Sequence, residues 1–354
     1  MSFYDEIKRL KMTTEYYTKF INGILWKVPK TSTVWSRKDI WSTIKVRWSI
    51  GRMNYRIKPG LYAVGNPDSN SEIFVTANFK LSFDHLRRAL HEMDAWILVL
   101  DTKGINVWCA AGKGTFGTRE LTYRIKAHEL DKLVNHKRVI VPQLGATGVS
   151  AHEVKNSTGF RVIYGPVRAE DIKEFVAAGL KATPEMRKVT FPLIERIKLI
   201  PVELAYGKYY LLVVPAIFFI LSGLNKNGFS IDLALSAGGE AVIDLLSAYL
   251  AGCVITPILL PWIPFRRFSL KGLVISWIMA IPLLYYNFLG NTIFENISWF
   301  LIMGALSSFL AMNFTGSTTF TSLSGVRKEM KIALPLQIGA TVLGIIGWII
   351  SRFI

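Results

Sequence analysis

Five long apolar stretches in the second half of the chain constrain its fold more than any other feature. They are Tyr209 to Leu224, about Ala234 to Ile263, Gly272 to Leu289, Ile297 to Met312 and Ile332 to Ile350. A helix needs about 20 apolar residues to cross roughly 30 Å of hydrocarbon, so each stretch is a candidate membrane span, the first and fourth being a little short. We expect an all-α transmembrane bundle of five helices.

The division of charge along the chain agrees with this boundary. Residues 1–206 hold 33 basic and 20 acidic side chains, whereas residues 207–354 hold 9 and 5. With a mean hydropathy of +0.32, the chain as a whole is too apolar for one ordinary soluble domain. We expect a basic, aromatic, membrane-proximal segment over 1–58, a cytoplasmic α/β domain over 59–182, a linker over 183–207 and a transmembrane domain over 208–354.

Basic residues in the loops set the expected orientation. They fall between the second and third stretches and between the fourth and fifth: Arg266, Arg267, Lys271, Arg327, Lys328 and Lys331. Loops rich in Lys and Arg stay in the cytoplasm. The N-terminus is polar and lacks the apolar core of a signal peptide. We therefore expect a multi-pass protein of the cytoplasmic (inner) membrane, with the N-terminal domain inside and the C-terminus outside.

Two carboxylates, Glu240 and Asp244, interrupt the second apolar stretch. They are four residues apart and share one helix face. Either they form a polar site inside the membrane, as charged residues within spans usually do, or the span begins near Leu245 and leaves both acids at the outer interface.

Residues 1–58 combine 13 basic with 4 acidic side chains and interleave several Trp and Tyr. Basic and aromatic residues together can indicate nucleic-acid binding. Joined to a membrane domain, they more simply indicate a surface that lies on anionic headgroups or packs on the next domain. We expect no nucleic-acid partner.

Between about Gly60 and Gly179, short β-rich runs alternate with helical patterns. The expected strands are Leu61 to Val64, Ile73 to Ala77, Ala95 to Leu100, Arg138 to Val141 and Phe160 to Tyr164. This alternation predicts an α/β, Rossmann-like domain with a largely parallel sheet, whose ligands bind at the carboxyl ends of the strands.

The segment from Asp101 to Gly117 follows the third of these strands and contains Cys109. It does not match a Walker P-loop, because the required Gly and Ser/Thr positions hold Val107 and Gly114. Gly112, Gly114 and Gly117 fit the dinucleotide spacing but lie too far beyond the strand. From these residues alone, Cys109 is either a buried structural thiol or a ligand-binding residue.

The cysteine count limits the chemistry further. The chain has only two cysteines, Cys109 and Cys253. Iron–sulfur clusters usually take four thiolates, and structural zinc takes four closely spaced Cys or His ligands. We therefore expect no iron–sulfur cluster in this chain.

The string Asn106-Val-Trp-Cys-Ala-Ala-Gly-Lys113 resembles the cap-helix signature of the mercury-methylating corrinoid proteins, the HgcA family. That family's domain is similar to the corrinoid-binding domain of the corrinoid iron–sulfur protein of acetyl-CoA synthesis. Further matches are Val75 to Asp84, Gln143 to Val149 and Tyr164 to Ala169, so the resemblance covers roughly residues 60–180. The attached membrane domain also fits the mercury-methylating family.

The resemblance implies a cobamide cofactor, with the Cys109 thiolate as lower axial ligand of its cobalt and as the catalytic residue. The implied reaction is transfer of the cobalt-bound methyl group to Hg(II), forming methylmercury. Other implied cofactor-binding residues are Asn106, Val107, Trp108, Ala110, Ala111, Gly112, Lys113, Gly145, Ala146, Thr147, Gly148, Gly165 and Pro166. Asn78 and Phe79 either face the ring or cap the strand-to-helix turn.

The implied partners are a ferredoxin-like iron–sulfur protein of the HgcB type as electron donor, and a methyltetrahydrofolate-linked methyl donor. Two other functions remain open. One is a membrane transporter or sensor with a cytoplasmic α/β regulatory domain, working through Glu240 and Asp244. The other is a corrinoid methyl carrier of general one-carbon metabolism.

Overall fold

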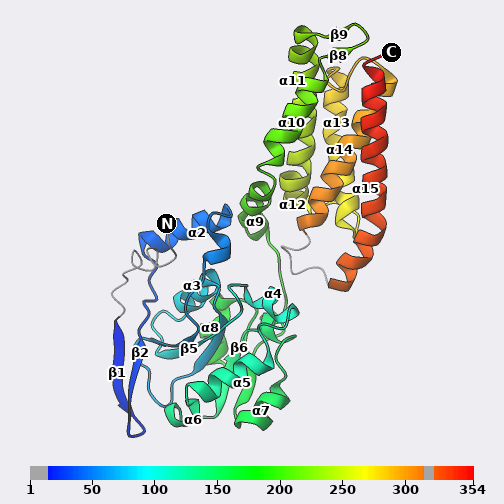
Figure 1. The fold of residues 1–354 in the computed structure, drawn as a ribbon. Helices are drawn as coiled ribbons and strands as arrows, with labels where there is room; N and C mark the ends of the chain where they lie inside the picture. Colours follow the sequence, from blue (N-terminus) through cyan, green and yellow to red (C-terminus); the bar gives the residue numbers. More distant parts are fainter. Residues whose placement is uncertain (1–14, 315–322) are drawn as a thin grey trace. The chain divides into compact units, whose positions relative to one another are not determined.

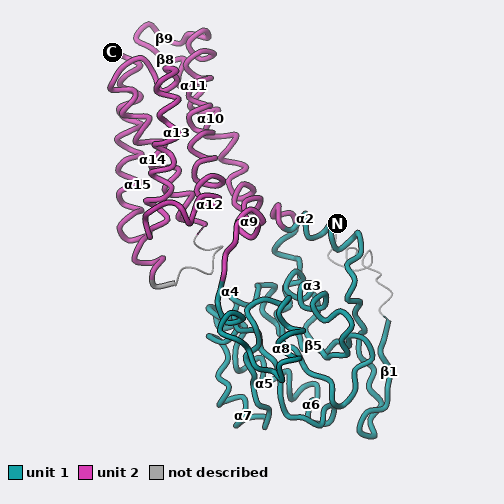
Figure 2. The backbone as a smooth tube through the Cα atoms, turned by 180° about the vertical axis from the view of Figure 1, so that it is seen from behind, with its two compact units in different colours: residues 1–46, 51–189 teal, residues 47–50, 190–354 magenta. Residues whose placement is uncertain are grey.

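The computed structural model describes residues 15–314 and 323–354, and the chain divides into two compact units (Figure 2). One unit comprises residues 1–46 and 51–189, and the other residues 47–50 and 190–354. Residues 1–14 of the expected basic segment lie outside the described part of the chain.

The first unit, whose strands β5 and β6 are labelled in Figure 1, is built on a five-stranded sheet in the order β3-β5-β4-β6-β7. The strands are β3 (Gly60–Val64), β4 (Ile73–Ala77), β5 (Ala95–Leu100), β6 (Arg138–Val141) and β7 (Arg161–Tyr164). Strand β3 is antiparallel to β5, and the other neighbouring pairs are parallel. Every residue of β4 and β5 is buried, as in a sheet covered on both faces. The predicted α/β domain with a largely parallel sheet is confirmed.

Helices cover both faces of this sheet. One core cluster contains side chains from α3 (Lys80–Ala89) and α8 (Ile172–Ala177). The other contains side chains from α5 (Thr118–Ala127), α6 (Leu130–Leu133) and α7 (Ala151–Thr158). The remaining elements are short: α4 (Val107–Gly112) and the 3₁₀ turns η1 (Arg52–Asn54), η2 (Gln143–Gly145) and η3 (Ala169–Asp171).

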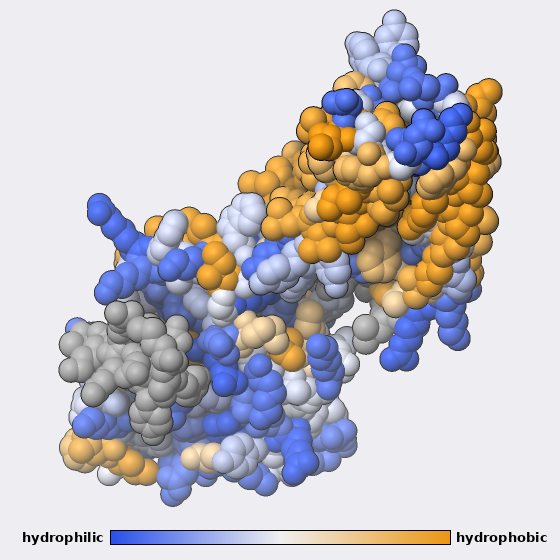
Figure 3. Space-filling view, turned by 45° about the horizontal axis from the view of Figure 1, so that its top comes forward, coloured by the Kyte–Doolittle hydropathy of each residue, from blue (hydrophilic) through white to orange (hydrophobic). Residues whose placement is uncertain are grey.

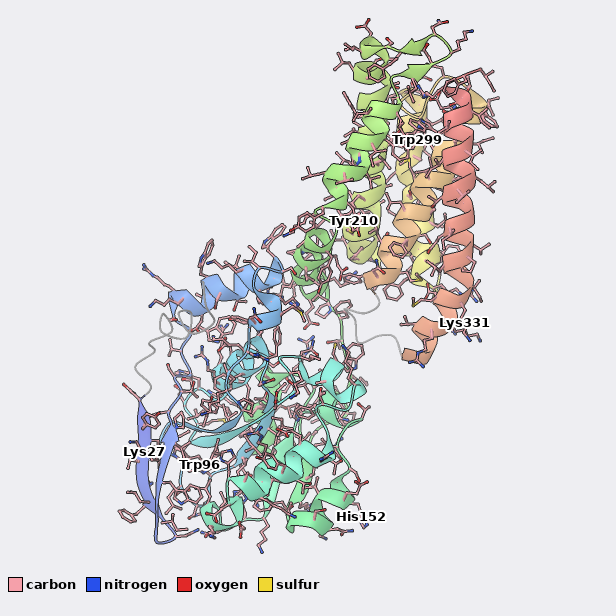
Figure 4. All side chains as sticks on the ribbon, in the orientation of Figure 1. Lys27, Trp96, His152, Tyr210, Trp299 and Lys331 are labelled. Carbon is pink, nitrogen blue, oxygen red and sulfur yellow. The ribbon has the colours of Figure 1, made fainter. Side chains whose placement is uncertain are left out.

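Part of the basic N-terminal segment packs on this domain. Strands β1 (Tyr16–Ile21) and β2 (Ile24–Pro29) form a hairpin whose turn residues, Asn22 and Gly23, both have positive φ, as a type I′ turn requires. The Tyr17 ring packs edge-on against Trp96, which is labelled in Figure 4, with 5.6 Å between the ring centroids. The expectation that the basic segment packs on the next domain therefore holds for this hairpin. Helix α2 (Arg37–Arg47) follows it.

The second unit is almost entirely helical, and the face of it that Figure 3 shows is largely apolar. Its helices are α9 (Leu193–Tyr206), α10 (Tyr210–Leu221), α11 (Ile231–Leu250), α12 (Thr256–Leu259), α13 (Phe268–Tyr285), α14 (Ile293–Asn313) and α15 (Leu323–Ser351). A π-helical segment, η4 (Ala251–Ile255), joins α11 to α12, and a small hairpin of β8 (Leu224–Asn225) and β9 (Gly228–Phe229) precedes α11.

The described part of the chain contains four helices that are long and apolar enough to cross a membrane, or up to five spans if one bent pair counts as one. The bent pair is α9 and α10, which meet at 56°. Helix α10 alone has 12 residues and extends only about 18 Å. The expected first span is therefore not a regular span of its own, and most of the expected linker 183–207 is helix α9.

The chain packs closely on α11 at the bend between α9 and α10. A Cβ atom on Gly207 would lie 2.2 Å from the Tyr249 hydroxyl, so the backbone there has room only for glycine. The same hydroxyl donates a hydrogen bond to the Leu204 carbonyl at 2.9 Å. Helix α11 thus contacts the end of α9 where the chain turns.

Several basic residues assigned to loops lie in helices instead. Arg327, Lys328 and Lys331 belong to α15. Lys271 belongs to α13 and is buried, with its ammonium donating to the carbonyls of Leu260 and, at 3.0 Å, of Ile263. The nearby prolines at 261 and 264 prevent a regular helix there and leave carbonyls that need a donor.

Candidate functional site

The sheet has a topological switch point between β4 and β6. The chain leaves β4 through α3 on one face to reach β5, and leaves β6 through α7 on the other face to reach β7 (Figure 1). Where neighbouring parallel strands send their connections to opposite faces, a crevice opens at their carboxyl ends, and ligands of such sheets bind there.

Helix α4 lies at this edge of the sheet and carries Cys109. It follows β5, and it contacts β4 and the η2 turn that follows β6. Its N-cap is Asn106, whose side-chain oxygen accepts a hydrogen bond from the Cys109 backbone N–H at 2.9 Å. The Cys109 side chain is half-buried, and its thiol is free of any disulfide. The prediction that Cys109 stands on a helical turn at the ligand edge of the sheet agrees with this placement.

Asn78 fixes the loop that leads from β5 to α4. Its side chain is 2% exposed, and its oxygen accepts hydrogen bonds from Thr102 and, at 2.9 Å, from the Gly104 N–H. Its amide nitrogen donates to Asp101 at 3.2 Å. These contacts favour the capping alternative for Asn78 and make it a support of the loop that presents Cys109.

Phe79, the neighbour of Asn78, is buried away from solvent. Its ring packs edge-on with Tyr55 at 6.1 Å, and the Arg52 guanidinium lies 5.5 Å from its centroid. Phe79 also forms the N-cap of α3. These contacts place it in the packing between η1 and α3.

Two of the predicted glycines allow the two halves of the site to pack closely. A Cβ on Gly148 would lie 2.1 Å from the Phe116 carbonyl oxygen and 3.0 Å from the Ala111 Cα. A Cβ on Gly145 would lie 2.5 Å from the Phe116 ring. The Gly148 carbonyl also accepts from the Thr118 N–H at 3.1 Å. The segment 145–148 therefore lies directly against α4 and the loop after it.

The other predicted residues form the rest of this edge. Gly165 and Pro166 are buried; the Gly165 N–H donates to Val141 at 2.8 Å, and the Pro166 carbonyl accepts from Gln143. Ala110 and Ala111 are buried, Val107, Trp108 and Ala146 are half-buried, and Gly112, Lys113 and Thr147 are exposed. The structure brings all of these to the region of α4 and η2.

Three residues that support the site were not predicted as site residues: Asp101, Thr102 and Glu120. Glu120 accepts from the Asp101 N–H at 2.9 Å and from Arg124 at 2.6 Å. Partial burial opposes ionisation of Asp101, but hydrogen bonds from the Lys103 N–H and ammonium outweigh it and lower its pKa. In the sequence, Asp101 and Thr102 are marked only by their position directly after a buried strand. Glu120 is marked only by its position on α5.

The two membrane acids both lie on α11, which begins at Ile231. At 1.5 Å per residue, Glu240 and Asp244 are roughly 13 and 20 Å along the helix from its start, inside the candidate span Ile231–Leu259. Both alternatives for the two acids, a polar site inside the membrane and the outer interface, stay predictions. Asp244 is fully buried, and neither carboxylate oxygen has a hydrogen-bond partner among the described residues.

The described residues contain no group of three or more His, Cys, Asp or Glu side chains placed to hold a metal ion. Cys253 is buried in the π-helical segment, consistent with a small core residue. Cys109 therefore belongs to no such group among the described residues.

Comparison with known proteins assigns the region around α4 to a family. Residues 43–176 match the family model described as the CO dehydrogenase/acetyl-CoA synthase delta subunit, CdhD. The chain contains a CdhD-family domain. This domain holds the whole strand order from β3 to β7, with α4 and η2.

Curated relatives match the same part of the chain. The corrinoid/iron–sulfur protein large subunit of Moorella thermoacetica is 31% identical over 127 residues, 35% of this chain and 28% of that protein. The acetyl-CoA decarbonylase/synthase complex subunit gamma of Methanopyrus kandleri is 30% identical over 122 residues, 34% of this chain and 26% of the relative. The same subunit of Archaeoglobus fulgidus is 29% identical over 136 residues, 37% and 28% of the two chains.

The chain thus spans only about a quarter of the length of these relatives. The expected similarity to the corrinoid iron–sulfur protein of acetyl-CoA synthesis is confirmed for the CdhD-family domain. Membership of the mercury-methylating family stays a prediction.

Proposed function

We propose that this chain is a membrane-anchored corrinoid protein that transfers a methyl group from a cobalt-bound methylcobamide to Hg(II), forming methylmercury. The observation that supports it most is the position of Cys109. A free, half-buried thiol stands on α4, at the switch point of a CdhD-family sheet. The candidate spans make a multi-pass membrane protein the simplest setting.

The residues present fit a cobamide. The Asn106 side chain satisfies the Cys109 N–H, so the thiol sulfur is not needed to cap the helix. Gly112, Lys113 and Thr147 are exposed beside it, and Gly145 and Gly148 keep the neighbouring segment close. A thiolate is a soft, strongly donating ligand suited to cobalt, and its affinity for a metal depends on deprotonation.

In this proposal the Cys109 thiolate would hold the cobalt of a bound cobamide, while Asn106 and Asn78 hold α4 and its loop in place. When bound, the cobamide would supply a cobalt-bound methyl group that leaves with its bonding electron pair for the electrophilic Hg(II). Donation from the Cys109 sulfur favours that direction of transfer. Segment 145–148, with Gly165 and Pro166, would line the cofactor's nucleotide tail.

Renewed methylation of a bound cobamide would call for a low-potential electron donor, and two cysteines do not suffice for a cluster in this chain. We therefore propose a separate ferredoxin-like partner of the HgcB type as electron donor, and a methyltetrahydrofolate-linked enzyme as methyl source. Both would act on the cytoplasmic side, with the C-terminus outside.

The first test is the anaerobic absorption spectrum, with cobalt counted per chain, of the full-length protein reconstituted with cobalamin. We expect about one cobalt per chain and a thiolate-shifted spectrum that Cys109→Ala loses and the matched Cys253→Ala control keeps. A wild-type protein without corrinoid, or a Cys109→Ala spectrum equal to that of the wild type, contradicts the proposed site.

A second candidate is a corrinoid methyl carrier of general one-carbon metabolism, favoured by the names of the relatives. The two functions differ in the methyl acceptor. We expect methyl loss from the methylated protein to depend on Hg(II), with methylmercury as product. Loss to another acceptor, at a rate that Hg(II) does not change, would favour the carrier.

One observation favours the transporter alternative: the carboxylate of Asp244 is buried and has no hydrogen-bond partner among the described residues. This alternative predicts that the purified protein contains no cobalt and that Cys109→Ala keeps its full transport or sensing activity. Asp244→Asn would then abolish the activity, whereas methyl transfer at α4 should tolerate that substitution.

A further inference from the structure

Helix α2 is fixed to the CdhD-family domain by one face. Asp39 on that face pairs with Lys80 at 2.9 Å and Arg87 at 3.0 Å, both on α3. Partial burial opposes ionisation of Asp39, but hydrogen bonds from Lys80 and Ser36 outweigh it and hold its pKa well below the usual range. The helix is therefore a rigid part of the domain surface.

The same face is closed by packing. Thr43 and Val46 are buried, and the Ser42 hydroxyl lies 2.8 Å from the Tyr55 hydroxyl. Asp39, Ser42, Thr43 and Val46 recur at helical spacing and form one face of α2. This face packs on the domain.

The opposite face of α2 is apolar and exposed. Ile40, Trp41 and Ile44 are 49%, 59% and 43% exposed, and their spacing of one, three and four residues places them together. Large apolar side chains gathered on one exposed helix face mark a surface that another apolar phase covers.

Basic side chains border this apolar face. Arg37, Lys38 and Lys45 are exposed on the same helix, and the Lys45 ammonium lies 5.6 Å from the centre of the Trp41 ring. Acidic side chains are scarce here: Asp39 is the only one between residues 16 and 58, and it points to α3. We name the set of Ile40, Trp41, Ile44, Arg37, Lys38 and Lys45 the α2 surface.

We propose that the α2 surface docks on the anionic headgroup layer of a membrane. Trp and Ile enter the interface of a bilayer, while flanking Lys and Arg contact lipid phosphates. We choose a membrane as the partner because the same polypeptide has at least four candidate spans, which would hold the chain at a bilayer. The proposal is independent of the cofactor chemistry at Cys109.

The test uses the full-length chain in nanodiscs of phosphatidylcholine, with or without one quarter phosphatidylglycerol, and lipids brominated near the headgroup. The emission of Trp41 is obtained as the difference between the wild type and Trp41→Phe. We expect brominated lipid to quench this emission about twofold when phosphatidylglycerol is present, and raised salt to weaken the quenching.

Charge reversal supplies the matched comparison. Lys38→Glu with Lys45→Glu should remove at least half of the quenching, whereas Lys155→Glu with Lys181→Glu, at exposed lysines elsewhere on the domain, should leave it unchanged. The proposal is overturned if aqueous iodide quenches Trp41 equally in both lipid mixtures while brominated lipid does not. It is equally overturned if only an added soluble protein shields Trp41.

Discussion

The side-chain oxygen of Asn78 accepts two hydrogen bonds from Thr102, one from the backbone N–H at 3.1 Å and one from the hydroxyl at 2.8 Å. This pair connects the end of β4 to the loop after β5. The Thr102 hydroxyl also contacts the Ile105 carbonyl at 2.6 Å, one residue before the cap of α4. The position of Cys109 therefore depends on a residue 31 positions earlier in the chain.

Asn78→Ala should destabilise the CdhD-family domain by about 2–3 kcal/mol, because it leaves several buried polar groups without partners. In a Cys253→Ala background, thermal unfolding and the rate of Cys109 alkylation measure the effect; we expect faster alkylation as the loop loosens. Thr102→Ser keeps both hydrogen bonds and is the control. An Asn78→Ala protein with unchanged stability and alkylation rate would show that Asn78 does not support the loop.

Asn106→Ala removes the cap of α4 and should cost about 1 kcal/mol locally. Hydrogen exchange of the α4 amides should accelerate, and corrinoid binding should weaken in proportion. Asn106→Ser restores a capping oxygen and should recover both properties. If Ser behaves like Ala, the cap is not what orders this helix.

Gly148→Ala places a methyl group where the Phe116 carbonyl already lies, 2.1 Å away. Backbone cannot yield as a flexible side chain does, so we expect a loss of about 3 kcal/mol or more and separation of segment 145–148 from α4. The neighbouring exposed Thr147→Ala should be almost neutral. Circular dichroism melting of the two variants, compared directly, checks this prediction.

His128 should make the domain less stable in mild acid. Partial burial lowers its pKa, and the charge of Arg124 lowers it further. The unfolded chain then binds more protons than the folded one between the lowered pKa and about 6.5, so this contribution is complete above that pH and is lost as the pH falls. His128→Gln should reduce the loss of melting temperature between pH 7.5 and 5.5, whereas exposed His152→Gln should not. Equal losses in both variants would contradict the assignment.

The sequence predicted the sheet well, because buried strands such as Ala95 to Leu100 are continuous apolar runs bounded by polar loops. It also located Cys109 at the ligand edge, since the carboxyl end of a strand fixes that edge. It did not predict Asp101, Thr102 and Glu120, whose roles arise from contacts between distant segments. Polar residues of these types in a loop carry no local signal of their partners.

The membrane part shows a different limit. Hydropathy located α11, α13, α14 and α15, but it treated Tyr209 to Leu224 as an independent span. At the bend after α9, Gly207 lies against Tyr249 of α11, a contact that no window of apolar residues contains. Lys271 was placed in a loop because charge counts do not reveal carbonyls that need a buried donor.

The close fit of Gly148 against Ala111 and Phe116 joins two segments that belong to opposite halves of the sheet. Both halves therefore contribute to the edge of the sheet that carries Cys109, and a ligand bound there, as proposed, would touch both of them. Binding would then stabilise the domain against separation of β4 from β6, by an amount that grows with the ratio of ligand concentration to Kd. When such a ligand is removed, we expect proteolytic cleavage in the loops that flank α4 before any change in the rest of the fold.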